Sequence, residues 1–157
     1  MAANADNPPS PSPMESIMQR ADHVLIHLTL EPAQGQTLPP SPLGVELAAY
    51  VRALLENLDA PPIVVGASET ELTLVAPLPA TMSTSHLVFC IKQSSERWLQ
   101  QTTDSPDFRW APGYRALSVD LRTLAVTIRR IRRSSTSLDL TSNSRWIHER
   151  SSPSALP

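Results

Sequence analysis

The chain has 157 residues, a hydrophobic fraction of 41%, 16 prolines and a formal net charge of −2. This length predicts one domain, and the proline content is about twice the usual share. No apolar run approaches the roughly 20 residues of a membrane-spanning helix, and no apolar signal segment is visible, so we expect an intracellular protein, cytoplasmic or nuclear. The single cysteine, Cys90, excludes an intrachain disulfide and is expected to be a buried structural thiol.

Charge is distributed unevenly along the chain. Residues 1–110 contain five Lys/Arg against twelve Asp/Glu, whereas residues 111–157 contain eight Arg against three Asp/Glu. Lys92 is the only lysine. Arginine suits bidentate contacts to phosphate or carboxylate groups, although a coding bias is the simpler explanation of so strong a preference.

The segment 23–31 alternates in polarity, which predicts a half-buried strand. A helix is expected to follow, with Ser41 as its N-cap and Pro42 at its first position. Apolar residues recur there at spacings of three, four and seven, and Pro61 and Pro62 end the helix. Residues 63–65 and 71–76 read as two strands of a hairpin.

The segment 83–104 has two interpretations. Its apolar residues fit one helical stripe, but the β-branched and aromatic content of 86–92 favours a fourth strand followed by a short helix over 96–101. We take the second interpretation.

The segment 117–133 is read as a helix. Leu117, Leu121, Leu124, Ile128 and Ile131 are spaced four, three, four and three residues apart, as in a heptad seam. Two strands broken at Arg122-Thr123 are the alternative, because Val119, Val126, Thr127 and Ile128 also fit an alternating pattern.

Together these segments predict an α+β fold, a small two-layer sandwich with a mostly antiparallel sheet and the element order β-α-β-β-β-α-α. The single domain would span residues 22–133. Disordered tails rich in Pro, Ser or Thr would occupy residues 1–21 and 134–157.

No catalytic, cofactor-binding or metal-binding residues are predicted. His23 and His27 lie on one face of a strand about 13 Å apart, too far for one metal ion. The four glycines are too dispersed for a phosphate-binding loop, and no serine lies in a nucleophile elbow. No cofactor and no small-molecule ligand are therefore expected.

The sequence supports three functional hypotheses. The first is a non-enzymatic accessory or protein-interaction module, a complex subunit or a homodimer, with the five-residue seam as the partner surface. The second is a small regulatory or viral nucleic-acid-binding protein. It would act through Arg129, Arg130, Arg132 and Arg133, which could equally meet an acidic partner. The third is a small enzyme whose site is scattered in the sequence.

Overall fold

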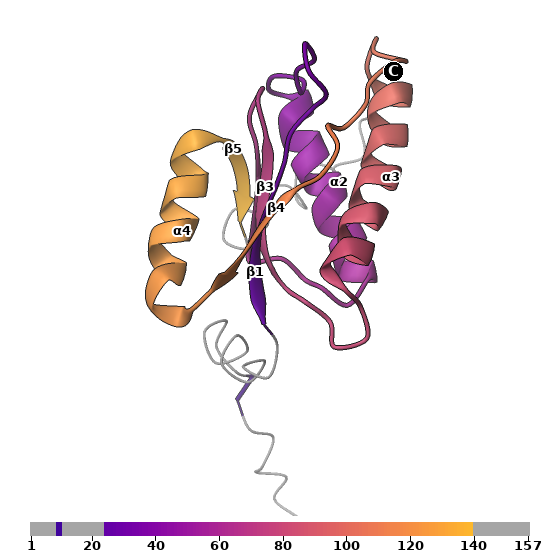
Figure 1. Cartoon of the computed structure of the whole chain (residues 1–157). Helices are drawn as coiled ribbons and strands as arrows, with labels where there is room; N and C mark the ends of the chain where they lie inside the picture. The colour runs from indigo at the N-terminus through magenta and orange to yellow at the C-terminus, as the bar shows by residue number, and fades with distance from the viewer. Residues whose placement is uncertain (1–8, 11–23, 140–157) are drawn as a thin grey trace, which may run out of the picture.

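A computed structural model describes residues 9–10 and 24–139 of the chain. The described residues form strands β1 (Leu25–Leu30), β2 (Val64–Ala67), β3 (Leu72–Pro77), β4 (Arg115–Val119) and β5 (Thr136–Asp139), and helices α2 (Leu43–Asn57), α3 (Thr84–Thr102) and α4 (Leu121–Ser134). The strands make one antiparallel sheet in the order β4-β1-β3-β2-β5. Helices α2 and α3 lie on one side of this sheet, and α4 lies on the other (Figure 1). The predicted α+β class and antiparallel sheet are confirmed.

Strand β1 follows from its alternation. Ile26, Leu28 and Leu30 are at most 4% exposed and pack in the core beneath α2 and α3. Leu25 packs instead against the apolar cluster that contains Leu124 and Ile131 of α4, so the residues of its parity face the opposite side of the sheet. The predicted strand is confirmed, and it places His27 on the α4 side.

Helix α2 and the β2–β3 hairpin also form where the sequence predicts them. The predicted N-cap is wrong, because the helix begins at Leu43 with Pro42 as its N-cap and without a side-chain capping bond. In the hairpin turn, Ser68 Oγ accepts hydrogen bonds from the backbone N–H groups of Thr70 and Glu71 at 3.3 and 3.2 Å. That turn closes β2 onto β3.

We expected residues 86–92 to form a strand. They instead lie in the first half of α3. Ser83 caps this helix by accepting a hydrogen bond from the His86 N–H at 3.1 Å. Leu87, Ile91 and Leu99 lie on the buried stripe of the whole helix. A helix of 19 residues buries this stripe against the sheet, and the burial outweighs the β propensity of a seven-residue run.

Residues 117–133 divide between two elements. Asp120 caps α4 by accepting hydrogen bonds from the N–H groups of Arg122 and Thr123, both at 2.9 Å. The residues before Asp120 form β4, which pairs with β1. The observed order is therefore β-α-β-β-α-β-α-β, and β5 extends the sheet past the predicted domain boundary at residue 133. The two predicted tails otherwise lie mostly outside the described residues.

Two apolar clusters hold the described residues together. The larger one fills the space between the sheet and the α2/α3 layer. The smaller one joins Val64 and Val75 of the sheet to Leu124 and Ile131 of α4. Among the helices of the described residues, none has the length and apolar character that crossing a membrane requires.

Candidate functional site

Helix α4 is basic on its outer side and apolar on its inner side. It carries five arginines and no acidic residue. Leu124 and Ile131 are 6% and 2% exposed against the sheet, whereas the arginines are all exposed. The four arginines singled out from the sequence, Arg129, Arg130, Arg132 and Arg133, thus lie together in the last two turns of one helix. The basic side chains cluster at the C-terminal end of the helix, where the macrodipole favours positive charge.

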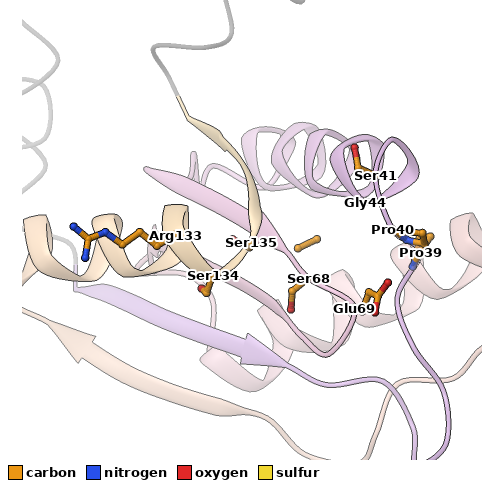
Figure 2. A pocket seen from close by; sticks show the side chains of 10 residues that line it. Pro39, Pro40, Ser41, Gly44, Ser68, Glu69, Arg133, Ser134 and Ser135 are labelled. Carbon is orange, nitrogen blue, oxygen red and sulfur yellow. The ribbon is translucent and has the colours of Figure 1, made fainter.

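Two hollows lie beside this end of α4. One, of about 410 Å³, is lined by Val126, Arg129, Arg130, Arg133 and Ser134. A second, of about 350 Å³, lies between the end of α4, the residues before α2 and the β2–β3 turn. In Figure 2 the Arg133 side chain extends along α4, away from Glu69 at the other end of the second hollow. We therefore assign the basic character to the first hollow.

Three polar side chains, those of His27, Thr29 and Thr73, lie together on the sheet next to α4. The ring of His27 hydrogen-bonds through Nε2 to Thr73 Oγ1 at 2.8 Å, and the Thr29 and Thr73 hydroxyl oxygens are 3.5 Å apart. Desolvation by burial lowers the pKa of His27 below its usual 6.5; Glu71 opposes this shift, whereas the positive charges of Arg115 and Arg130 add to it. The imidazole is therefore neutral at pH 7 and lies within the fields of both arginines.

Arg115 stands between two carboxylates. Its Nη2 is 3.4 Å from Glu31 Oε1 and 3.4 Å from Glu71 Oε2. A third hollow, of about 530 Å³, opens beside it and is lined by Thr29, Glu31, Tyr114, Arg115 and residues 111–113. Sequence analysis did not identify this site, because its residues come from distant parts of the chain.

The five residues of the predicted seam do not form one stripe. Leu117 belongs to β4 and is 66% exposed, and Leu121 at the start of α4 is 56% exposed. Leu124 and Ile131 are buried against the sheet, with Ile128 packed beside them. The seam is thus divided between two elements, and part of it stabilises the fold itself.

The remaining candidate side chains are scattered. Cys90 is partly exposed rather than buried, with its Sγ 3.7 Å from His86 Nε2. His23 lies outside the described residues. Within residues 9–10 and 24–139, no three His, Cys, Asp or Glu side chains are grouped so that they could hold a metal ion.

No protein-family model and no curated protein matches the chain. Solved structures do match it. A structure described as a putative transposase from Deinococcus radiodurans aligns with a TM-score of 0.58 and 15% identity, over 72% of this chain and 92% of that one. A REP-associated tyrosine transposase bound to a REP hairpin aligns with a TM-score of 0.54 and 9% identity, over 69% of this chain and 64% of that one.

At these identities the likeness establishes the fold, one that transposases use. It overturns our first hypothesis of a non-enzymatic accessory or protein-interaction module, because both neighbours are described as transposases. The chain spans less than two thirds of the hairpin-bound structure.

Proposed function

We propose that this domain binds DNA through the outer side of α4 and the adjoining sheet. The observation that carries the proposal is the two-sided character of α4, in which Leu124 and Ile131 fix the helix on the sheet while five arginines face outward. The description of one structural neighbour as a transposase bound to a REP hairpin supports DNA as the polyanion.

The arginines are suited to phosphate contacts. Arg129 and Arg133 are four residues apart and therefore neighbours on the helix surface, with Arg130 beside them. Guanidinium groups bind phosphate oxygens in a bidentate manner, and such contacts position a protein on DNA without reading its sequence. The hollow between these side chains and Val126 can receive part of the sugar-phosphate backbone of DNA.

The proposal concerns binding and assigns no catalytic residue. The chain has two tyrosines, Tyr50 and Tyr114. Tyr50 stacks on Trp98 with ring centroids 5.5 Å apart, and its hydroxyl donates to the Ser94 carbonyl at 3.4 Å. Tyr114 lies at the third hollow. Neither belongs to α4, whose arginines carry the proposal.

Salt-dependent binding to a DNA hairpin tests this proposal. We would measure fluorescence anisotropy between 50 and 200 mM salt for the wild type and for the double variant Arg129→Ala/Arg130→Ala. Each lost phosphate contact reduces the slope of log K against log salt concentration by about 0.9, so the double variant should lower it by about 2.

The double variant Arg97→Ala/Arg109→Ala is the matched control. It also removes two charges, from α3 and the following loop, and both side chains are exposed. This variant should retain a slope close to that of the wild type. Equal losses in the two double variants, or wild-type binding without salt dependence, would contradict the proposed interface.

A further inference from the structure

The outer ridge of α4 has an apolar residue in the middle of its basic side chains. This ridge carries Arg122, Val126, Arg129 and Arg133, all of them exposed. Their spacings of four, three and four residues place them along one line of the helix. Leu121 is also exposed, but it lies about 140° around the helix from Val126, because each residue turns the chain by about 100°. Val126, which is 49% exposed, is therefore the large apolar side chain of the ridge.

The side chains around Val126 border it with positive charge. Arg129 and Arg130 are three and four residues further along α4, so they adjoin Val126 on its two sides. Arg129 Nε donates to the Ala125 carbonyl at 3.4 Å, which directs this side chain back along the helix towards Val126. Among the residues that line the hollow of about 410 Å³, Val126 alone is apolar. A small apolar group thus lies between guanidinium groups.

The ridge is placed where a large ligand can reach it. Helix α4 lies on one side of the sheet, and α2 and α3 lie on the other (Figure 1). Leu124 and Ile131 fix the inner side of α4 on the sheet, so the ridge points away from the protein. An α-helix is about 10–12 Å across, the major groove of B-DNA is about 12 Å wide and the minor groove is about 6 Å wide. Of the two grooves, the major groove admits the helix.

The composition of α4 favours duplex DNA over a single strand. Proteins that bind single strands stack the bases on aromatic side chains, and no residue of α4 is aromatic. In the major groove of a duplex, thymine exposes its C5 methyl group, which small apolar side chains contact. Phosphates border the groove and bind arginines. One apolar side chain flanked by arginines therefore matches the chemistry of this groove.

We infer that α4 lies in the major groove of duplex DNA, with Val126 against the C5 methyl group of a thymine and with Arg129 and Arg130 on phosphates that border the groove. This inference rests on the proposed DNA binding and deepens it, because it names the form of the DNA and a residue that determines specificity. It predicts a preference for thymine at the position that Val126 reaches.

Replacement of thymine by deoxyuridine tests the methyl contact without changing the base pairing. We would first use the full chain to select the tightest binder from DNA hairpins whose stem sequence is randomised. In that hairpin, each thymine of the stem would then be replaced in turn by deoxyuridine, which lacks only the methyl group. The affinity of the wild type should fall by about 4-fold at the contacted position, as expected for one buried methyl group, and should stay unchanged at the others.

Val126→Ala removes the side chain that contacts this methyl group. The variant should bind the thymine and deoxyuridine hairpins equally, and it should keep α4 intact because alanine favours a helix, which circular dichroism checks. Val24→Ala is the matched control, since it truncates a valine that is 55% exposed outside α4, and it should keep the wild-type ratio. A single strand with the sequence of one half of the stem should compete at least about 10-fold less well than the hairpin.

Three results would overturn the inference: equal wild-type affinities for thymine and deoxyuridine at every position, the wild-type ratio in Val126→Ala, or equal competition by the single strand and the hairpin. Each of them is compatible with salt-dependent binding through Arg129 and Arg130. Absence of that salt dependence would instead refute the proposed function, and the two failures are thus distinguishable.

Discussion

Gly66→Ala should loosen the C-terminal end of α4. Gly66 lies on β2, and a Cβ atom there would overlap Ser135 Oγ, lie 2.9 Å from Ile131 Cγ2 and lie 3.1 Å from Ser135 Cβ. Strand β2 is paired on both sides, with β3 and with β5, so it cannot move away. The end of α4 must shift instead.

The expected cost follows from this crowding. The Ser135 hydroxyl can rotate away, but the Ile131 methyl group and the Ser135 Cβ must give way by several tenths of an ångström. Overpacking of this kind costs about 1–3 kcal/mol. With a urea m-value of about 1–3 kcal/mol/M, the unfolding midpoint should fall by about 1 M. Amides in the last turn of α4 should exchange faster than in the wild type.

A second substitution identifies the cause. Ser135→Gly removes both the hydroxyl and the Cβ atom that a new methyl group at position 66 would meet. The double variant Gly66→Ala/Ser135→Gly should therefore regain at least half of the lost stability, measured as a double-mutant cycle. Additive effects of the two substitutions, or a Gly66→Ala protein with the wild-type midpoint, would refute the reasoning.

Three further predictions concern other side chains. The pKa of His27 is lowered in the folded protein, so as the pH falls the unfolded chain binds a proton at His27 before the folded protein does. The free energy of unfolding should therefore decline as the pH falls below 6.5. Urea titrations at pH 7.5 and 5.5 should show that His27→Gln lacks this part of the decline. Ser95→Ala should cost about 1–3 kcal/mol in thermal or urea unfolding, because the buried Trp110 indole N–H donates to Ser95 Oγ at 3.0 Å; an unchanged midpoint would disprove this role. Ile131→Ala should cost about 2–5 kcal/mol by leaving a cavity under α4, and it should weaken hairpin binding in the anisotropy assay.

The elements that were predictable are those whose pattern is local. Ile26, Leu28 and Leu30 alternate so clearly that the strand and its buried face follow from the sequence alone. Helix α2 is equally clear, from a continuous apolar stripe ended by prolines. Each of these elements buries the same face that its sequence pattern indicates, because no neighbouring element alters that face.

The errors arise where two patterns compete. Residues 86–92 have β-forming side chains, but Leu87, Ile91 and Leu99 together fit one long helical face, and only the sheet below decides between the two. The heptad spacing through Leu117 is a coincidence that crosses from a strand into a helix. Asp120 was the available signal, because an Asp before an apolar run marks a helix start.

The candidate site divides in the same way. The sequence itself shows the basic run of Arg129, Arg130, Arg132 and Arg133. The fold brings these four side chains to one surface. The third hollow has no such signal, because Thr29 and Arg115 meet only through the pairing of β4 with β1, and Lys92 of α3 bonds to the carbonyl of Ala111 in the adjoining loop. Sites assembled from distant segments require the three-dimensional arrangement to be recognised.

The unequal sizes of the two apolar clusters have a consequence for how the molecule opens. Among the described residues, twenty form the cluster beneath α2 and α3, and four form the one beneath α4. Cooperative units with little buried apolar surface open at lower free energy than the rest of a protein. Helix α4 should therefore detach from the sheet and pack on it again while the rest of the protein stays folded. Under the proposed function, this motion would let the arginines of α4 adjust to the curvature of bound DNA.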